Sequence, residues 1–306
     1  MTKMTPMLEQ YMAVKAQAQD AFLFFRLGDF YEMFFDDAIL AARELEITLT
    51  SRGHGSDERI PMCGVPYHSA ESYIAKLIEK GYKVAICEQV EDPAEAKGVV
   101  RREIVRVVTP GTVMDGKALP ERANNFLASV AAEGGVWALA ACDLTTGELY
   151  ATQAESEQDA ADELSVYAMS ELVAPSALAQ RMARLLGDRK IGAAVTVREV
   201  PGAEEGLREH FPKMSLETLS PPVRAAVRLL LSYLLETQRR SLGHIHSVSV
   251  YETGFFMTLD PFTRKNLELV ETVRDRARKG SLLGLLDRTA TSMGARLLRR
   301  WLDKPL

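Results

Sequence analysis

The stretch Ala21-Phe22-Leu23-Phe24-Phe25-Arg26-Leu27-Gly28-Asp29-Phe30-Tyr31-Glu32 decides the fold of the first part of the chain. Its apolar run is short, rich in aromatic residues and stopped by Gly28, which predicts a buried strand that ends in a turn. Phe30 and Glu32 follow at i and i+2, so a continuing strand would present both side chains on one face. A flat apolar ring beside a hydrogen-bond acceptor suits a wedge that enters between DNA bases. From spacing alone, the commoner role of Phe30 is packing in an aromatic core.

Strand and helix signals alternate through the first block. They predict strands over 21–27, 47–51, 82–89 and 102–109, and helices over 34–46 and 69–80. Ser69 is placed to begin the second helix and Gly81 to end it. Pro110-Gly111 ends the last strand. This order predicts a mixed-sheet α/β domain over 1–115, followed by a polar linker over 116–124.

A second α/β domain is predicted over 125–245 and the start of an all-α domain over 246–306. Two hairpin signals, Glu133-Gly134-Gly135 and Thr145-Thr146-Gly147, separate β-rich runs. The predicted strands are 125–132, 136–143, 147–152, 171–174 and 194–199, and the predicted helices are 157–169 and 175–187. Two long amphipathic stretches, 222–238 and 281–302, indicate helices. Between them, Ser247–Glu252 and Phe255–Asp260 are predicted to form a short strand pair.

The composition is that of a multidomain globular protein. Hydrophobic residues make up 47% of the 306 residues, and no apolar run of about 18 residues indicates a membrane span. The N-terminus lacks the basic and apolar organisation of a secretory signal, which predicts a cytoplasmic location. Cys63, Cys87 and Cys142 are far apart in the sequence, so we expect reduced packing residues.

Charge is distributed unevenly along the chain. The net charge is -5, yet residues 1–115 hold 13 Lys and Arg against 18 Asp and Glu, whereas residues 261–306 hold 11 against 5. A domain that binds nucleic acid by bulk attraction usually carries a basic stripe. An acidic first domain would instead contact DNA through a few placed cations, and its discrimination would come from how easily the duplex deforms.

Three other patterns carry weaker functional signals. Residues 111–118 match the spacing of a phosphate-binding P-loop, but Ala118 stands where Ser or Thr should bind magnesium, and a linker turn is favoured. Asp143 ends a predicted strand where a nuclease could keep a metal carboxylate, but the following Thr145-Thr146-Gly147 favours a turn residue. His244 and His246 have the spacing of a metal-binding pair with no third ligand nearby, which favours packing or a loop.

Further runs follow the opening stretch in the order of a known family. They are Leu49-Thr50-Ser51-Arg52-Gly53, Pro61-Met62-Cys63-Gly64-Val65-Pro66-Tyr67-His68, Val84-Ala85-Ile86-Cys87-Glu88-Gln89, Val107-Val108-Thr109-Pro110-Gly111-Thr112, Leu235-Glu236-Thr237-Gln238-Arg239-Arg240, and Gly280-Ser281-Leu282-Leu283 through Arg299-Arg300-Trp301-Leu302. Together with the Phe30-x-Glu32 motif, they resemble the N-terminal portion of bacterial MutS proteins. The resemblance implies a mismatch-recognition domain, an RNase H-like connector domain and the start of a helical core.

The resemblance also implies roles for individual residues. Phe30 would stack on a mispaired base and Glu32 would hydrogen-bond that base. Arg52 and Arg102 match basic positions near DNA, where phosphate contacts fix register without reading sequence. Met62, Gly64 and Tyr67 belong to a loop that would line the opened minor groove, although Tyr67 could equally be a core residue.

The function that the resemblance implies is recognition of base mismatches and small insertion/deletion loops in double-stranded DNA, with bending of the duplex. No chemical step is expected from this chain, because the family's ATPase domain, with its ATP and magnesium, would lie in a missing C-terminal part. A MutL-type protein is the expected partner, with the connector domain as its expected docking surface. The family's full-length proteins are expected to be homodimers, whereas this fragment would be a monomer in a nucleoid-associated, cytoplasmic setting.

Two alternatives of other classes stay open from the sequence. A metal-dependent RNase H-like nuclease would depend on Asp143. A protein-docking module without DNA contact would be unaffected by loss of Phe30. No cofactor or metal site is predicted within these 306 residues.

Overall fold

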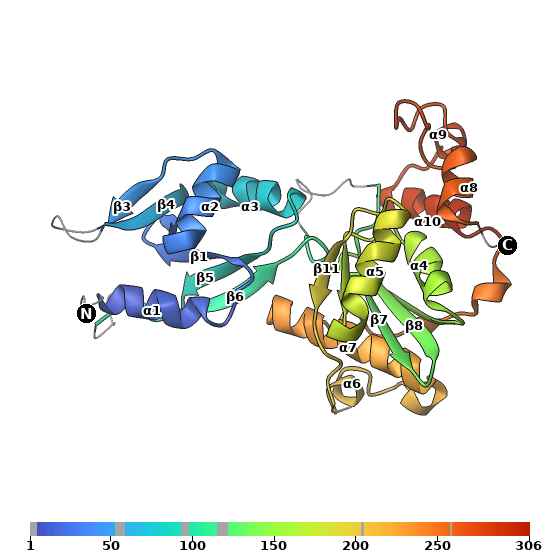
Figure 1. Cartoon of the computed structure of the whole chain (residues 1–306), viewed down its shortest axis with the longest axis horizontal. Coiled ribbons are helices and arrows are strands. Elements are labelled where there is room, and N and C mark those ends of the chain that lie inside the picture. The colour runs from blue at the N-terminus through green and yellow to red at the C-terminus, as the bar shows by residue number, and fades with distance from the viewer. Residues whose placement is uncertain (1–4, 53–58, 93–97, 115–121, 203–204, 258) are drawn as a thin grey trace. The chain divides into compact units, whose positions relative to one another are not determined.

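The computed structural model describes residues 5–52, 59–92, 98–114, 122–202, 205–257 and 259–306. The chain forms two compact units, one of residues 1–110 and 236–240 and the other of residues 111–235 and 241–306. Each unit is built on a six-stranded sheet with helices packed against it (Figure 1). The predicted α/β fold class with a helical last part is therefore confirmed. The domain limits 1–115, 125–245 and 246–306 stay a prediction.

The first unit has a mixed sheet in the order β3-β4-β2-β1-β5-β6. Its elements are α1 (Pro6–Lys15), β1 (Phe22–Leu27), β2 (Phe30–Phe34), α2 (Phe35–Leu45), β3 (Thr50–Arg52), β4 (Ile60–Pro66), a 3-10 turn (Tyr67–Ser69), α3 (Ala70–Glu79), β5 (Val84–Gln89) and β6 (Arg102–Val108). β1 pairs parallel with β5, and its other neighbour β2 runs antiparallel. The predicted strand over 21–27 is thus a central strand of the sheet.

Both faces of β1 are buried, which explains its unbroken aromatic run. Leu23 and Phe25 pack with Tyr11 of α1 on one face. Phe22 and Phe24 alternate with them and are also buried. α2 packs against β4 and β2, with the thiol of Cys63 donating to the carbonyl of Ala38 at 3.4 Å. The strand is therefore a fixed base for the hairpin that follows it.

The second unit has a sheet in the order β11-β10-β7-β8-β9-β12. Its elements are β7 (Phe126–Glu133), β8 (Val136–Asp143), β9 (Glu148–Ala154), α4 (Glu157–Ser165), β10 (Glu171–Ala174), α5 (Ser176–Asp188), β11 (Ala194–Val197), α6 (Glu205–His210), a 3-10 turn (Leu216–Thr218), α7 (Pro221–Gln238), β12 (Ser249–Val250), a 3-10 turn (Thr253–Phe255), α8 (Pro261–Asn266), α9 (Leu282–Leu286) and α10 (Ser292–Asp303). The antiparallel strands β7, β8 and β9 form the predicted meander.

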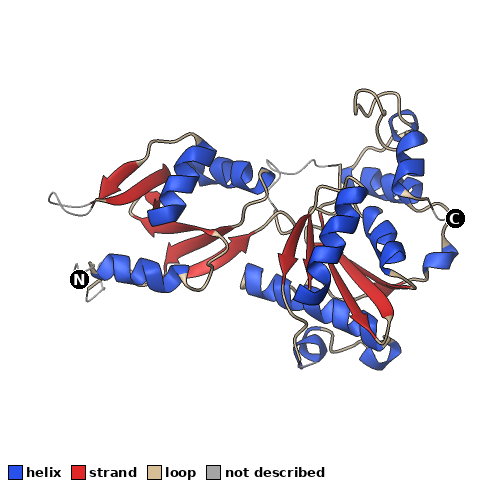
Figure 2. Cartoon of the chain, viewed as in Figure 1, coloured by secondary structure: helices blue, strands red, loops and turns tan. Residues whose placement is uncertain are grey.

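Helices cover both faces of this second sheet (Figure 2). α4 and α5 contribute Leu164 and Met182 to the apolar cluster on one face. α7 contributes Leu230 and Tyr233 to the cluster on the other. Strand residues alternate between the two clusters, so both faces of the sheet are buried. Its central strands are therefore nearly continuous apolar runs in the sequence.

The structure corrects several predicted elements. The predicted strand pair over 247–252 and 255–260 is wrong, because Ser249–Val250 is the only strand among the described residues of these ranges, and it pairs with β9. The predicted single helix over 281–302 is two helices, because Asp287 accepts the Thr289 N–H and Thr291 caps α10 through the Gly294 N–H. Neither α1 nor β4 is predicted by the sequence.

The three cysteines fit the prediction of packing residues. Cys63, Cys87 and Cys142 are free and buried. Burial raises the pKa of the Cys63 thiol to about 11 and that of the Cys87 thiol to about 12. These thiols are therefore protonated and unreactive at neutral pH.

Candidate nucleic-acid interface

A tight hairpin carries Phe30 at the start of β2. Leu27 pairs with Phe30 across the hairpin, which leaves Gly28 and Asp29 as a two-residue loop. Gly28 has a φ of 56°, a value that glycine adopts without strain. The hairpin places the aromatic ring at the end of a strand whose partner β1 is buried on both faces. Phe30 is thus supported by the core without being part of it.

Phe30 and Glu32 lie on the same face of β2, as their spacing predicts. Phe30 is 46% exposed, whereas Tyr31 between them is 7% exposed. Across the ladder, Phe30 pairs with Pro66 and Glu32 with Gly64. Cross-strand partners share a face of the sheet. The expected juxtaposition of an exposed ring and a carboxylate is therefore present in the structure.

Gly64 keeps this face of the sheet open. A Cβ atom at Gly64 would lie 3.3 Å from the carbonyl oxygen of Tyr31 and 3.8 Å from Cδ1 of Phe30. Because Gly64 has no side chain, no Cβ atom crowds the Phe30 ring and the Glu32 stem. A ligand can approach the backbone closely at such a position.

β3 brings Arg52 to the same face. Thr50 pairs with Met62 and Arg52 with Ile60, so that β3 extends the face formed by β4 and β2. Nη1 of Arg52 lies 3.1 Å from Oε2 of Glu32, with half of the arginine side chain exposed. Met62 is half-buried and packs partly against the core cluster under α1. Arg52, Met62 and Gly64 are thus brought together with Glu32.

The Glu32 carboxyl is partly withdrawn from solvent. Burial raises its pKa above the ordinary value of 4.5, and the Arg52 guanidinium opposes this rise. Desolvation disfavours the charged form, whereas a nearby cation favours it. Burial is the larger effect, so this carboxyl binds a proton more readily than an exposed one.

Tyr67 lies at the end of β4, beside the hairpin loop. It is 46% exposed, and its backbone N–H donates to the carbonyl of Asp29 at 2.9 Å. The Arg26 guanidinium carbon lies 3.8 Å from the centre of the Tyr67 ring. The sequence-based alternative of a core position is therefore wrong for Tyr67.

Arg102 does not lie where a phosphate contact would need it. It is 7% exposed, and its guanidinium donates to the carbonyl of Arg26 at 2.6 Å, to that of Val100 at 2.8 Å and to Oε1 of Gln10 at 3.1 Å. Its guanidinium carbon also lies 5.1 Å from the Phe25 ring centre. These bonds fix strand ends and a loop, so the structure gives Arg102 a packing role in place of the surface position expected from the sequence.

Arg26 and Glu88 are the residues of this region that sequence reasoning missed. A charged residue inside an apolar strand, as Arg26 is, was the available signal. Its Nη1 lies 3.9 Å from Oε2 of Glu88, and the hydroxyl of Tyr31 donates to the same carboxylate. Both bonds lie on the side of β2 opposite to Phe30, because Arg26 pairs with Tyr31 in the ladder.

The residues of the three weaker sequence patterns have structural roles, as far as the structure describes them. Asp143 is fully buried and accepts hydrogen bonds from the Thr145 N–H at 2.8 Å and from Nδ2 of Asn124 at 2.6 Å, which confirms the turn role. Nε2 of His244 lies 3.0 Å from the carbonyl of Leu144. The described residues include no group of three His, Cys, Asp or Glu side chains suited to a metal. The second half of the P-loop-like stretch, residues 115–118, lies outside the described residues.

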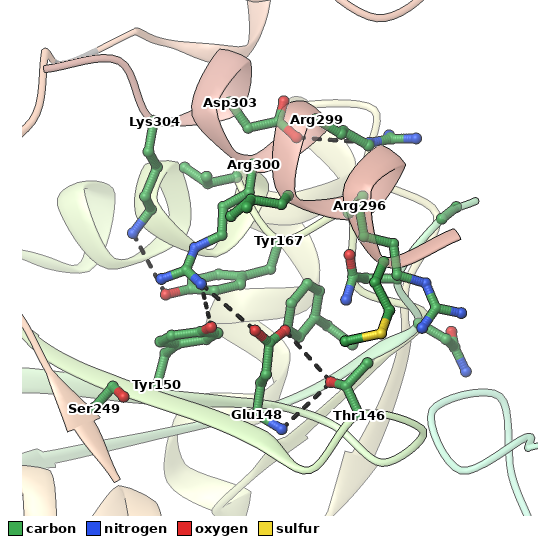
Figure 3. A pocket seen from close by; sticks show the side chains of 18 of the residues that line it. Thr146, Glu148, Tyr150, Tyr167, Ser249, Arg296, Arg299, Arg300, Asp303 and Lys304 are labelled. Carbon is green, nitrogen blue, oxygen red and sulfur yellow. Dashed lines mark hydrogen bonds and ion pairs between the residues drawn. The ribbon is translucent and has the colours of Figure 1, made fainter. Parts of the chain in front are cut away.

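A cavity of about 760 Å³ lies beside α10 in the second unit (Figure 3). Tyr150 on its wall faces Arg300, whose guanidinium carbon lies 4.2 Å from the ring centre. Lys304 lies 3.6 Å from the Tyr251 ring centre and pairs with Glu163. Burial lowers the pKa of Lys304 to about 8, against the opposing effect of Glu163. Arg300 thus attaches α10 to β9, and Lys304 attaches the end of α10 to α4.

The geometry defines a multidomain α/β protein whose first domain presents an aromatic ring and a carboxylate on an open sheet face. Three family models match the chain in sequence order. They are MutS domain I over residues 5–117, MutS domain II over 125–246 and MutS domain III over 262–306.

Curated relatives match along the whole chain. The DNA mismatch repair protein MutS of Geobacillus thermodenitrificans is 52% identical over 100% of this chain and 33% of its own length. The protein of the same name from Brevibacillus brevis is 50% identical over 100% of this chain and 35% of its own. That of Bacillus licheniformis is 52% identical over 99% and 34%. The chain belongs to the MutS family, and it spans about a third of the length of these relatives.

Proposed function

We propose that this chain recognises base mismatches and small unpaired loops in double-stranded DNA for mismatch repair. The observation that carries the proposal is the exposed Phe30 ring beside Glu32 on a rigid sheet face. The names of the relatives, DNA mismatch repair protein MutS, support the same function. No chemical step is assigned to the described residues in this role.

Recognition works through the deformability of the duplex. An apolar ring inserted from the minor groove unstacks a base step at a cost of roughly a few kcal/mol and bends the DNA. A mispaired or unpaired base is already less well stacked, so this cost is lowest there. Phe30 stands at the end of a hairpin with its ring half exposed, where a base step can reach it. Discrimination then needs no contact that reads a particular sequence.

Glu32 hydrogen-bonds the base against which Phe30 stacks. A carboxylate that enters a phosphate-lined groove is disfavoured while ionised. The pKa of Glu32 is already raised by burial in the free protein. Phosphate charge and further desolvation raise it more, so that a protonated Glu32 donates to an acceptor on the base.

The remaining residues of this face hold the DNA close. Arg52 keeps half of its side chain in solvent while it pairs with Glu32, so it can also reach a phosphate. Gly64 leaves room beside the Phe30 ring, and Met62 lies on the same face of the sheet. Tyr67 is not included as a DNA contact, because its ring stacks on Arg26 on the side of β2 opposite to Phe30. Arg102 is not included, because its guanidinium is buried and bonded within the protein.

Further parts of the family's activity are proposed for the whole protein. ATP and magnesium would be bound outside these residues, two subunits would hold the DNA, and a MutL-type protein would dock on the second unit. The location would be the cytoplasm, in association with the nucleoid. No helix among the described residues is long and apolar enough to cross a membrane.

A titration of heteroduplex and homoduplex DNA at low salt tests the proposal. The wild-type chain should bind a duplex with one mismatch more tightly than the matched duplex, and Phe30→Ala should abolish the difference. Phe255→Ala is the matched control, because Phe255 is a 70% exposed phenylalanine of the second unit. Equal affinity of the wild-type chain for both duplexes, or unchanged discrimination by Phe30→Ala, would overturn the proposal.

Glu32 is tested in the same titration. Glu32→Gln keeps a hydrogen-bond donor and should retain discrimination over the pH range in which the wild type discriminates. Glu32→Ala removes donor and acceptor and should lose it. A loss of discrimination by Glu32→Gln at every pH would exclude the protonated donor.

A further inference from the structure

The two carbonyl groups of the hairpin loop before Phe30 are both held from outside the loop. The carbonyl of Gly28 accepts a hydrogen bond from Nε of Arg26 at 2.6 Å. The carbonyl of Asp29 accepts the backbone N–H of Tyr67 at 2.9 Å. Exposed hairpin loops usually leave such groups to water. This loop is therefore fixed from the β1 side and from the end of β4 at once.

Arg26 and Tyr67 also hold each other. The Arg26 guanidinium carbon lies 3.8 Å from the Tyr67 ring centre, a stacking distance for a cation on an aromatic face. Glu88 lies 3.9 Å from the guanidinium and also accepts the hydroxyl of Tyr31. The side chain of Arg26 is only 18% exposed, so the guanidinium is largely shielded from solvent, although Tyr67 itself is 46% exposed.

We infer that Arg26 and Tyr67 are positioning residues that fix the projection of Phe30 from the sheet. The inference rests on the proposed function, since it concerns the ring that enters the DNA. A binding group that is already ordered loses less conformational entropy on binding. With both loop carbonyls held, the backbone of Phe30 has one orientation before DNA arrives. Loss of the stack lets the loop move, and ordering it again weakens insertion.

A direct phosphate contact is a different role for the same arginine, and the geometry disfavours it. The planar guanidinium is used on one face by the Tyr67 ring, at its Nε by Gly28 and at Nη1 by the Glu88 carboxylate. The carboxylate compensates its charge. A positioning role predicts loss of discrimination, whereas a phosphate contact predicts weaker binding to every duplex.

Substitutions at both residues test the inference. Arg26→Lys keeps the charge but lacks the planar fork that stacks and donates together. It should lower the ratio of heteroduplex to homoduplex affinity about tenfold, which corresponds to about 1.4 kcal/mol. Tyr67→Ala should do the same, whereas Tyr67→Phe keeps the ring and the backbone donor and should retain the wild-type ratio.

Hydrogen exchange of the Tyr67 amide gives a readout that needs no DNA. The hydrogen bond to Asp29 should protect this amide from exchange in the wild type and in Tyr67→Phe. In Arg26→Lys the same amide should exchange faster, while the amides of the core strands keep their protection. An unchanged affinity ratio in Arg26→Lys would overturn the inference. An equal loss of affinity for heteroduplex and homoduplex, with the slope of log affinity against log salt concentration reduced by about one, would also overturn it. That result would indicate a phosphate contact.

Phe30→Ala, measured in parallel, separates this inference from the proposed function. If Phe30→Ala leaves binding unchanged, the wedge itself fails, and the exchange rate of the Tyr67 amide still decides whether Arg26 orders the loop. If Phe30→Ala loses discrimination and Arg26→Lys does not, the wedge stands and the positioning role is rejected.

Discussion

The two sheets of the molecule each contain a tight hairpin with a glycine of positive φ, and the surroundings of the two hairpins differ. Gly28 in the β1–β2 hairpin has a φ of 56°, and a Cβ there would meet no atom within 4 Å. Gly147 in the β8–β9 hairpin has a φ of 76°, and a Cβ there would lie 2.5 Å from the carbonyl oxygen of His244. The first hairpin is open to a ligand, and the second is covered by the chain itself.

The difference shows which of these two hairpins can act on another molecule. The residue after the open loop, Phe30, is 46% exposed, whereas the residue before the covered loop, Asp143, is fully buried and serves the turn. A metal nuclease needs reachable carboxylates. The structure of the second hairpin therefore disfavours the nuclease alternative, and binding surface is available at the first hairpin.

The largest effect that this comparison predicts is on folding stability. Gly147→Ala combines a strained positive φ with a clash against backbone, and we expect a loss of about 3 kcal/mol or more in the free energy of unfolding of the second unit. Gly28→Ala carries only the strain and should cost about 1 kcal/mol in the first unit. Both tryptophans, Trp137 and Trp301, lie in the second unit, so urea unfolding followed by tryptophan emission reports on that unit alone.

Hydrogen exchange supplies the stability of the first unit, which contains no tryptophan. Protection from exchange in the peptides around Gly28 and Gly147 measures the loss of stability caused by each substitution. Equal losses for the two substitutions would remove the distinction between an open and a covered hairpin.

A second comparison concerns two clusters in which a cation, aromatic rings and a carboxylate meet. The Arg26 cluster borders the exposed Tyr67, whereas the Lys304 cluster is closed in by Tyr167 and Tyr251. The side chains of Lys304 and Glu163 are 12% and 15% exposed. Removal of one partner from a buried ion pair leaves an uncompensated charge. Lys304→Met should therefore lower the stability of the second unit by about 3 kcal/mol.

Arg208→Met is the matched control for Lys304→Met in the same unit. The Arg208–Glu217 pair has a separation of 3.1 Å but is exposed on both sides, so water replaces the lost partner. The loss should be much smaller and should shrink further at high salt. Tryptophan emission during urea unfolding measures both variants. A loss for Arg208→Met as large as that for Lys304→Met would contradict a buried anchoring role for Lys304.

The sequence predicts the regular parts of both sheets well and fails where pairing depends on distant residues. The meander β7–β9 was predictable, because glycine-containing turns separate apolar runs of strand length. β4 was not predictable, because Pro61, Gly64 and Pro66 are typical of a loop. Its strand conformation comes from pairing with β2 and β3. The predicted partner for Ser249–Val250 was wrong for the same reason, since β9 lies about a hundred residues earlier.

The candidate site divides in a similar way. The shared face of Phe30 and Glu32 follows from their spacing once a strand is assumed. Spacing does not predict the burial of Arg102 or the stacking of Arg26 on Tyr67. Both depend on contacts between residues far apart in the sequence, such as Arg102 with Gln10 and Tyr67 with Asp29. Burial of an arginine is decided by packing, which a local pattern does not contain.

The smallest predicted effect is the pH dependence that Glu32 adds to the stability of the first unit. The folded protein raises the pKa of Glu32 above its unfolded value of 4.5, so the folded state holds this proton more tightly than the unfolded state. The stabilising contribution of protonated Glu32 is therefore fully present below pH 4.5 and is lost as pH rises through the folded-state pKa. Glu32→Gln should remove this dependence, so that its stability relative to wild type increases from acid to neutral pH.

Two further substitutions sharpen this last prediction. Arg52→Gln removes the cation that opposes the rise in the pKa of Glu32, so the wild-type decline in stability should extend to higher pH. Glu103→Gln is the control, because Glu103 is a 55% exposed carboxylate of the same sheet. Hydrogen exchange of first-unit peptides from pH 4 to pH 7, corrected for intrinsic rates, measures the three variants. If the stability of Glu32→Gln and of Glu103→Gln changed with pH in the same way, Glu32 would be an ordinary surface carboxylate. Phe30 would then be the only distinctive chemical group at the first hairpin.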